Sequence, residues 1–465
     1  MSMTMREESY DVVVLGGGAS GISAALSAAS EGARTLLVDA GPMVGGELLS
    51  GINLLGMLSS KGEWIVGGAA RRFLDECDRL GGYIGVVRDY RPLHFVAFDP
   101  EIMKVAVSSV LAEAGGELRL YTFAGEVVTE DGYVTGVVLL NKAGRTLVRA
   151  KAFVDCSGDG DLSIAAGAPY ESGDSSTGAF QSVTMVFRMV GVETGPLLDF
   201  MKAHPEHFAI SEEAFRSIAP SRQEAIDGLH AQGLPKLALS GNGPLLSQAI
   251  DAGEMYATSI VAIVPVSMER KEVSINSTKV SNVDATDSKA ISGTYATLLD
   301  QAMTCSRFLE RRLPGFENAR FSGLAPRIGI RETRRVMGDY VLTGDDVRSA
   351  RKHADGIARG GHPIDVWVAG RGVHWNIVEG GDYYDIPFGA LLPKGLRNVV
   401  VDGRCLSSTR EGQSSARVMG TCLAMGQAAG TAAALAMNAN TARYDLRSTD
   451  VQELRSRLKA NGAIV

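Results

Sequence analysis

Residues 11–39 read DVVVLGGGASGISAALSAASEGARTLLVD, and this stretch decides the fold class. The apolar, β-branched run at 11–15 predicts a buried strand, and glycines follow it at 16, 17, 18 and 21. The small residues at 22–30 predict a helix, and a second apolar run at 33–38 predicts another strand. We therefore expect a strand–helix–strand unit of about 30 residues.

Gly16, Gly18 and Gly21 have the spacing GxGxxG, and Asp39 ends the second strand. In this context the first glycine permits a tight turn, the second lets backbone approach a diphosphate, and the third allows close helix–strand packing. The helix start offers unpaired N–H groups to the phosphates, and the Asp39 carboxylate can accept hydrogen bonds from ribose hydroxyls. The predicted dinucleotide contacts in this unit are Gly16, Gly18, Ala19, Ser20, Gly21, Asp39 and Ala40.

The composition is that of a globular chain with an excess of glycine. The 465 residues are enough for two domains, and 55 of them are glycine, which is above the average share. Glycine in such numbers favours a close approach of backbone to a bulky ligand. The net charge of −7, without a basic run, argues against nucleic acid as a partner.

The cysteines and the N-terminus bear on metal binding and location. Five cysteines are dispersed without a CxxC spacing, at positions 77, 156, 305, 405 and 422. This pattern argues against a disulfide framework, a zinc site and a dithiol centre, so we expect no metal and buried thiols. The acidic N-terminus lacks a signal-peptide pattern, which predicts a cytoplasmic protein. The uncharged segment 419–437 could span a bilayer by length, but its Ala/Gly content favours a buried helix, and we expect no membrane partner.

The chain is expected to divide into three segments. Residues 1–169 form the first part of the dinucleotide domain, with a helix between Asp99-Pro100 and Gly115-Gly116 and then a small β-meander. Residues 170–383 alternate strand-like and helical stretches and predict an inserted, mixed α/β substrate or cap domain. Residues 384–465 return to the first domain with a strand at 398–402 and the Ala/Gly-rich helix. The predicted fold class is α/β, with a Rossmann-like domain.

Three features favour FAD over NAD as the dinucleotide. The Gly45-Gly46 doublet lies where flavoproteins run backbone along the ribityl chain, and the stretch SGDGD at 157–161 follows the meander. The C-terminal strand, turn and helix form a second binding element, in which a helix start would stabilise the reduced flavin at its N1–C2=O edge. The further predicted cofactor contacts are Gly45, Gly46, Val127, Ser157, Gly158, Asp161, Gly403, Arg404, Ser414, Ser415 and Ala416.

These motifs resemble those of the FAD-dependent oxidoreductases with the glutathione-reductase-type FAD-binding fold, and within them a bacterial group. The matching stretches are DVVVLGGGASGISAA, CSGDGDLSIAAGAP, INSTKV, RIGIRETRR, YDIPFGALLPKGLRNVVVDGRC and SSARVMGTCLAMGQAAGTAAALA. They extend from residue 11 to about 435, so the resemblance covers nearly the whole chain. More distantly, the order of segments is similar to that of the succinate dehydrogenase and fumarate reductase flavoproteins.

The resemblance implies how FAD is bound, and the sequence departs from the bacterial group at two places. The distant relatives attach FAD through a histidine near the glycine doublet, and residues 43–60 contain no histidine, so the resemblance implies non-covalent FAD. The bacterial group usually has a small apolar residue where Asp402 stands. It also has a Met-Ala-Thr-like stretch where residues 47–49 read Glu-Leu-Leu. Both changes are expected near the flavin.

The family reaction implied is hydride transfer between a small polar substrate and flavin N5. Arg331 could clamp a substrate carboxylate, although a structural Arg–Glu pair with Glu332 is an equally open interpretation. His374 is the preferred histidine for carrying a proton, and Tyr384 is a candidate substrate contact. The predicted catalytic residues are therefore Arg331, His374 and Tyr384.

Other functions stay open at this point. An NAD-linked dehydrogenase would explain GxGxxG but would leave the C-terminal element without a role. A flavin monooxygenase is favoured only by the stretch at 157–160, and a non-catalytic flavin-binding scaffold is the third alternative. The sequence names neither the substrate nor the electron acceptor, and a homo-oligomer is open.

Overall fold

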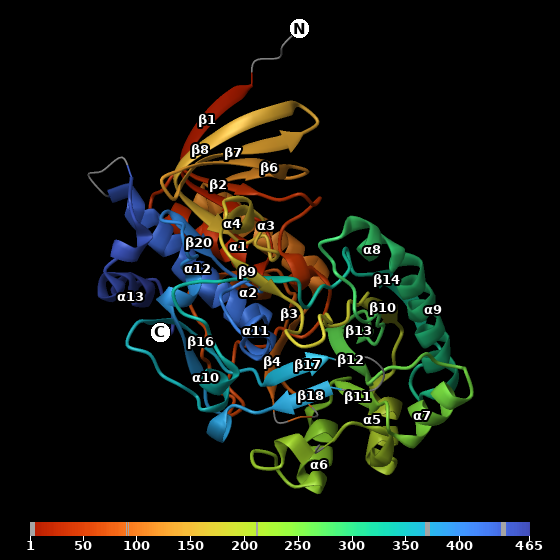
Figure 1. The fold of residues 1–465 in the computed structure, drawn as a ribbon. Helices are drawn as coiled ribbons and strands as arrows, with labels where there is room; N and C mark the ends of the chain where they lie inside the picture. Colours follow the sequence, from red (N-terminus) through yellow and green to blue (C-terminus); the bar gives the residue numbers. More distant parts are fainter. Residues whose placement is uncertain (1–4, 90, 92, 211–212, 368–372, 439–442) are drawn as a thin grey trace.

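The computed structural model describes residues 5–89, 91, 93–210, 213–367, 373–438 and 443–465. Its first sheet has seven strands in the order β5-β2-β1-β8-β7-β6, with β20 beside β8 (Figure 1). The strands are β1 (Arg6–Leu15), β2 (Thr35–Val38), β5 (Glu117–Arg119), β6 (Phe123–Glu130), β7 (Tyr133–Asn141), β8 (Gly144–Asp155) and β20 (Val399–Val401). β1 pairs in parallel with β2 and β8, and β20 pairs in parallel with β8. Strands from both ends of the chain therefore form one sheet, and the α/β fold class is confirmed.

Two helices from opposite ends of the chain pack closely on this sheet. They are α1 (Ala19–Ser30) and α12 (Met419–Leu435). A Cβ on Gly426 would lie 2.2 Å from the carbonyl oxygen of Ser20, and one on Gly430 would lie 2.1 Å from that of Ala24. The Gly-xxx-Gly spacing therefore serves close helix contact within the chain, because a larger residue would push the helices apart.

The buried character of α12 explains its uncharged sequence. Nearly every residue of this helix is buried, and its apolar residues belong to the core around the first sheet. Within the described ranges, no single helix is long and apolar enough to cross a membrane. The short helix α11 (Arg410–Ala416) and α12 meet that criterion only when joined, and they are bent by 92°.

A second sheet is antiparallel and has its own core. Its order is β11-β12-β13-β10-β14. Its strands are β10 (Phe187–Val190), β11 (Leu237–Ser240), β12 (Ile260–Ser267), β13 (Glu272–Asn276) and β14 (Arg320–Leu324). The helices of this segment are α5 (Thr194–Ala203), α6 (Arg222–Gln232), α7 (Pro244–Asp251), α8 (Ser288–Gly293) and α9 (Tyr295–Arg312). All eight residues of β12 are buried, so this strand lies at the centre of the second core.

Four two-stranded sheets complete the described strands. They pair β3 (Tyr83–Arg88) with β4 (His94–Phe98), β9 (Tyr170–Ser172) with β15 (Arg334–Val336), β16 (Gly356–Gly360) with β19 (Tyr384–Pro387), and β17 (Ile364–Trp367) with β18 (Val373–Asn376). The remaining α-helices are α2 (Ala69–Arg79), α3 (Pro100–Ala114), α4 (Asp161–Ala165), α10 (Gly344–Arg348) and α13 (Val451–Ala460). α3 begins as predicted, because the Asp99 side chain accepts a hydrogen bond from the backbone N–H of Glu101 at 2.9 Å.

The residues that form the two hydrophobic cores can be compared with the three segments predicted from the sequence. Leu342, Ile357 and Ile364 precede residue 384 but pack in the core of the first sheet. The chain therefore rejoins the first core before β19, whereas the side chains of 187–319 fill the second core. The boundaries at 169/170 and 383/384 stay predictions.

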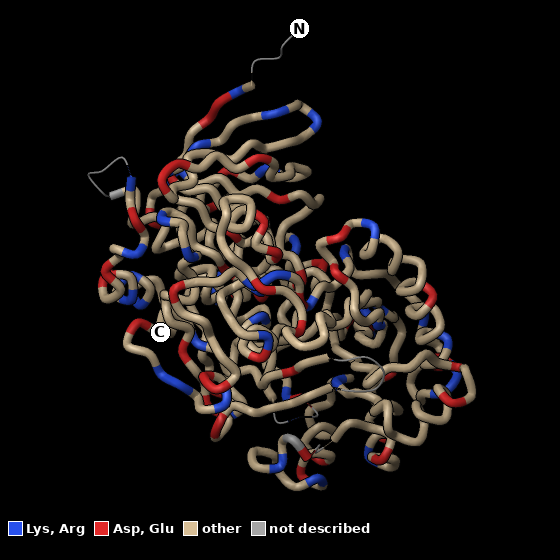
Figure 2. The backbone as a smooth tube through the Cα atoms, in the orientation of Figure 1, with Lys and Arg blue, Asp and Glu red and all other residues tan. Residues whose placement is uncertain are grey.

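Charged residues of both signs are interspersed along the described chain (Figure 2).

Candidate active site

A cleft lies between the first sheet and the second sheet. Its empty space is about 1640 Å³, including the open mouth. One wall carries the glycine turn after β1, and the opposite wall carries Ile260 and Ala262 of β12 with Asn276 of β13. The predicted cofactor residues that line the cleft are Gly16, Gly18, Ala19, Ser20, Asp39, Gly46, Ser157, Gly158, Gly403 and Arg404. The structure therefore brings both ends of the chain to one site.

The glycine turn has the geometry that its spacing predicts. Gly16 has φ +97°, and a Cβ on it would lie 2.3 Å from the carbonyl oxygen of Cys156. A Cβ on Gly21 would lie 1.7 Å from the carbonyl oxygen of Gly16. A Cβ on Gly18 would meet no described atom within 4 Å, so this position is open to the cleft. The turn is therefore closed toward the sheet and open where a diphosphate would approach.

Eight of the predicted cofactor residues are not among those that line the cleft: Gly21, Ala40, Gly45, Val127, Asp161, Ser414, Ser415 and Ala416. Gly21 acts in helix–strand packing, and Val127 pairs with Val137 in the meander. Asp161 begins α4 and forms an ion pair with Arg334. The structure does not bring these residues to the cleft lining, and their assignment as direct contacts stays a prediction.

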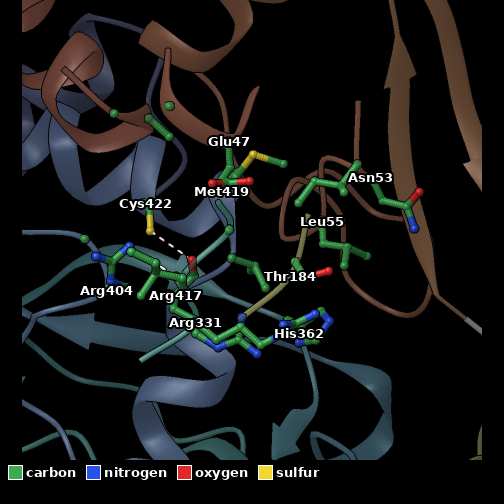
Figure 3. Close-up of a pocket in the computed structure, with 18 of the residues that line it drawn as sticks. Glu47, Asn53, Leu55, Thr184, Arg331, His362, Arg404, Arg417, Met419 and Cys422 are labelled. Atoms are coloured by element: carbon green, nitrogen blue, oxygen red, sulfur yellow. Dashed lines mark hydrogen bonds between the residues drawn. The ribbon is translucent and has the colours of Figure 1, made fainter. Parts of the chain in front are cut away.

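The helix start that faces the cleft lies further along the chain than predicted. Residues 414–416 form the last turn of α11, and α12 begins only at Met419 after the 92° bend. Val418, Met419 and Cys422 line the cleft, as Figure 3 shows for the latter two. The positive end of the α12 dipole therefore lies at Met419. The uncharged run that begins at Met419 is the sequence feature that could have located this helix start.

Polar groups on both walls suit FAD. Arg404 pairs with Asp159 at 2.6 Å and donates to the carbonyl oxygen of Ile330 at 3.1 Å. Its buried Nε, and the buried hydroxyl oxygen of Thr421 in the first turn of α12, have no hydrogen-bond partner among the described residues. A guanidinium and two helix starts around an open glycine turn are the donor set that a diphosphate and a flavin carbonyl require.

Arg331 is a cation of this cleft. Its Nη1 donates to the carbonyl oxygen of Ser182 at 2.6 Å. Burial, with the charge of Arg417 nearby, lowers the pKa of Arg331 to about 10, so it stays charged at neutral pH. No carboxylate of the described chain lies within 4.0 Å of it, whereas Arg417 pairs with Asp365 at 2.6 Å. Arg331 therefore has no ion-pair partner within 4.0 Å among the described residues, although the more distant Asp365 and Glu47 partly oppose the lowering of its pKa.

The structural alternative for Arg331 applies to its neighbours instead. Glu332 is 1% exposed and pairs with Arg335 at 2.9 Å and with Arg410 at 3.1 Å. Arg334 pairs with Asp161. Arg331 therefore takes no part in the ion pairs that Glu332 and Arg334 form with other segments of the chain.

Comparison with known proteins identifies the family. Residues 11–458 match the family described as FAD dependent oxidoreductase. The chain belongs to the FAD-dependent oxidoreductase family. This membership and the cleft together establish FAD as the cofactor of this oxidoreductase.

Curated relatives match only parts of this oxidoreductase. A digeranylgeranylglycerophospholipid reductase of Thermoplasma volcanium is 30% identical over 167 residues, which are 32% of this chain and 40% of that protein. The tRNA uridine 5-carboxymethylaminomethyl modification enzyme of Campylobacter hominis is 30% identical over 144 residues, which are 28% of this chain and 21% of that protein. The matches therefore span two fifths or less of these relatives.

A solved structure supports the fold alone. It is a geranylgeranyl bacteriochlorophyll reductase-like protein of Thermoplasma acidophilum, with TM-score 0.50 and 14% identity. The likeness covers 98% of the oxidoreductase and 84% of that chain. The likeness shows a shared fold and does not identify a substrate.

Two residues predicted to be catalytic lie outside the cleft lining. His374 is exposed on β18, opposite Val366 of β17. Tyr384 is fully buried, and its hydroxyl lies 2.6 Å from Oγ of Ser415. Neither residue lines the cleft: His374 is exposed on a hairpin, and Tyr384 is a core residue, so a catalytic role for either stays a prediction.

His362 is the histidine that the cleft contains. It is 3% exposed, and its Nδ1 lies 2.6 Å from the carbonyl oxygen of Pro363, so Nδ1 carries the proton and Nε2 keeps a lone pair. Burial lowers the pKa of His362 below its usual 6.5, partly opposed by Asp365, so the ring is neutral at pH 7. Figure 3 shows His362 and Arg331 together in the lower part of the cleft view. The stretch Gly360-Gly361-His362-Pro363 at a strand end was the missed signal.

Two tryptophans of the β17–β18 hairpin form part of the cleft wall. The rings of Trp367 and Trp375 are 6.3 Å apart and nearly perpendicular, and both line the cleft. The guanidinium of Arg91 lies 4.4 Å over Trp375, and that of Arg331 lies 5.4 Å over Trp367. This wall shields the two arginines from water, which strengthens their interaction with an anion.

One group of potential metal ligands lies away from the cleft. His204, Glu206 and His207 place ligand atoms within 4.8 Å of one another. Nδ1 of His207 accepts a hydrogen bond from the backbone N–H of Leu245 at 3.2 Å. The ring proton of neutral His207 is therefore on Nε2, which removes that nitrogen as a ligand, and we assign no metal to this group.

Proposed function

We propose that this oxidoreductase binds FAD non-covalently and oxidises a small organic substrate whose carboxylate is held by Arg331. The observation that supports the anchor is the position of Arg331: a cleft cation that no carboxylate of the described chain pairs with. A guanidinium matches a carboxylate in bidentate geometry, and such a bond strengthens in a desolvated site. This favours a carboxylate over a neutral polar group.

The neighbouring residues supply the remaining functions. Bound FAD would supply the acceptor for the hydride that leaves the substrate carbon. Nε2 of His362 would accept the proton that leaves the adjacent hydroxyl or amine, because the ring is neutral at pH 7. Trp367 and Trp375 would exclude water around this end of the substrate.

The cofactor part of the proposal is tested on the purified chain. Acid precipitation of yellow protein should release FAD into the supernatant, because residues 43–60 contain no histidine for a covalent bond. Flavin that stays with the pellet would contradict non-covalent binding.

The substrate part is tested by anaerobic bleaching of the flavin band. Small carboxylic acids, hydroxy acids and amino acids are compared with their amides, with the wild type, Arg331→Gln and Arg331→Lys. We expect bleaching by acids and not by amides, and a loss of about 10- to 100-fold in apparent affinity in Arg331→Gln, which is typical of a lost charged hydrogen bond. Arg312→Gln is the matched control, since Arg312 pairs with Glu254 on the surface. Equal bleaching by acids and amides would overturn the carboxylate assignment.

A further inference from the structure

The chain between β14 and β15 lines the cleft and is anchored by its backbone. The backbone N–H of Ala325 donates to the carbonyl oxygen of Val186 at 2.8 Å. Gly329 and Thr184 exchange two backbone hydrogen bonds, of 2.8 and 3.0 Å. These contacts fix residues 325–331, the cleft segment, beside the start of β10.

The cleft segment carries two arginines that are four residues apart. Arg331 is the proposed substrate anchor, and Arg327 also lines the cleft. Arg327 is exposed, and it has no hydrogen bond, ion pair or ring contact with any residue in the described ranges. Its guanidinium is therefore available to a ligand of the cleft.

The guanidinium of Arg327 lies close to the first turn of α1. A Cβ on Gly46 would lie 3.7 Å from Nη1 of Arg327 and 3.6 Å from the backbone nitrogen of Ala19. These two nitrogens are therefore separated by no more than the sum of the two distances, about 7.3 Å. Charged hydrogen bonds to phosphate oxygens are about 2.7–2.9 Å long, so a single phosphate group can contact both nitrogens.

The glycine doublet keeps the space beside Arg327 open. The backbone N–H of Gly45 donates to the carbonyl oxygen of Gly17 at 2.7 Å, so the doublet lies against the glycine turn. Gly46 has φ +57°, and a Cβ on it would lie 2.9 Å from Cα of Gly18. A side chain at this position would enter the space that Arg327 and the start of α1 share. Glycine therefore suits both the backbone conformation and the approach of a ligand.

Two acids lie beside this space. Glu47 follows the glycine doublet directly, and the Asp39 carboxylate accepts a hydrogen bond from the backbone N–H of Gly17 at 2.6 Å. Both acids line the cleft, and both would repel the negative charges of a diphosphate. The unpaired N–H groups of a helix start offset part of this repulsion, and the charge of Arg327 adds to them.

We propose that Arg327 binds the diphosphate of FAD together with the N–H groups at the start of α1. A guanidinium is planar and can donate two parallel hydrogen bonds to phosphate oxygens. The cofactor then joins the cleft segment, which follows β14, to the glycine turn, which follows β1. Arg327 acts on the cofactor alone, so its role does not depend on the substrate that Arg331 holds.

Binding of FAD to the cofactor-stripped full chain tests the role of Arg327. Dissociation constants are measured by flavin fluorescence for the wild type, Arg327→Gln and Arg327→Lys. We expect Arg327→Gln to bind FAD about tenfold more weakly, because a charged hydrogen bond to phosphate is lost. Arg327→Lys keeps the charge without the planar fork, so its affinity should lie between the other two.

Arg320→Gln is the matched control. Arg320 is exposed on β14, its Nη1 donates to the carbonyl oxygen of Ala319, and it does not line the cleft. Its variant should therefore bind FAD like the wild type.

Salt dependence and phosphorus NMR distinguish a phosphate contact from a structural effect. The loss of affinity in Arg327→Gln should shrink at high salt, because ions screen an exposed charge. The phosphorus resonances of bound FAD should shift in Arg327→Gln and not in Arg320→Gln, and the apo form of Arg327→Gln should unfold at the wild-type temperature.

Wild-type affinity for FAD in Arg327→Gln would overturn the proposal. A loss that high salt does not diminish, unchanged phosphorus resonances, or a lower unfolding temperature of the apo variant would overturn it as well. None of these measurements involves a substrate, so a failure here would leave the carboxylate anchor at Arg331 untouched.

Discussion

The guanidinium of Arg331 lies 5.4 Å over the indole ring of Trp367, while its Nη1 donates to the carbonyl oxygen of Ser182. The ring covers one side of the cation and the carbonyl holds one edge. The guanidinium is therefore oriented without being neutralised, which is how a cleft can hold a charge ready for a substrate anion.

Trp367→Leu should weaken the binding of carboxylates without affecting their amides. A cation–π contact of this kind contributes about 0.5–1 kcal/mol, or up to fivefold in a dissociation constant. The measurement is a titration of the FAD-loaded protein, followed by the change in flavin absorbance. Trp367→Phe keeps a ring and should lie between the wild type and Trp367→Leu. Unchanged affinity for carboxylates in Trp367→Leu would show that the ring does not support Arg331.

His362→Asn should slow flavin reduction by roughly 10²- to 10⁴-fold, the usual contribution of a proton acceptor. In the wild type the rate should fall as the pH drops below the pKa of His362, because the protonated ring cannot accept a proton. Since burial holds that pKa below 6.5, this acid limb lies below pH 6.5, and it should be absent in the variant. Stopped-flow reduction between pH 5 and 8 measures both effects.

His374→Asn is the matched control for His362→Asn. His374 is exposed on β18 and outside the cleft lining, so its variant should keep the wild-type rate and pH profile. A large loss in His374→Asn together with a normal His362→Asn would restore the residue first expected from the sequence.

Gly18→Ala and Gly21→Ala should separate cofactor binding from folding. A methyl on Gly18 meets no described atom within 4 Å, and its φ of −72° suits any residue, so the apo protein should keep its stability. The methyl would occupy the diphosphate space, so the affinity for FAD should fall at least about tenfold. A methyl on Gly21 would lie 1.7 Å from the carbonyl oxygen of Gly16, so this variant should lose stability itself. Thermal unfolding of both apo variants, with FAD titration, distinguishes them; equal stability would contradict the close packing at Gly21.

The stability of the apo protein should decline with pH because of Asp402. Burial raises its pKa in the folded state, so its contribution is fully present below the unfolded-state pKa and is lost as the pH rises toward the folded value. Above the unfolded-state pKa the wild type should therefore lose stability more steeply with pH than Asp402→Asn, by at most about 1.4 kcal/mol per pH unit. Urea unfolding at pH 5, 6 and 7 measures the slopes. Parallel slopes would show that Asp402 is ionised in the folded protein.

Local signals in the sequence predicted the parts of the fold that local chemistry determines. Gly16 and Gly21 follow from the steric needs of one turn, whereas Gly18 lies on its open side. Asp99 caps α3 through a hydrogen bond two residues away. The long apolar run from Met419 predicted a buried helix, which α12 is. These features need only a few neighbouring residues.

The predicted site residues that do not line the cleft depend on contacts distant in sequence. His362 reaches the cleft because β16 before it pairs with β19, while β18 carries His374 on the far strand of a hairpin. Tyr384 enters the core because its hydroxyl meets Ser415 of α11. The start of α12 depends on a 92° bend that no local motif near Ser414 specifies. Pairing of this kind is set by tertiary packing, which a single sequence does not display.

The central claim is that Arg331 holds the carboxylate of a substrate within the FAD cleft, beside the lone pair of His362. A crystal structure of the FAD-bound protein soaked with a small carboxylic acid that bleaches the flavin tests this most directly. We predict both carboxylate oxygens within about 2.7–2.9 Å of the Arg331 guanidinium, with Nε2 of His362 facing the adjacent hydroxyl or amine. A carboxylate bound elsewhere in the cleft, with Arg331 still held only by Ser182 and Trp367, would contradict it.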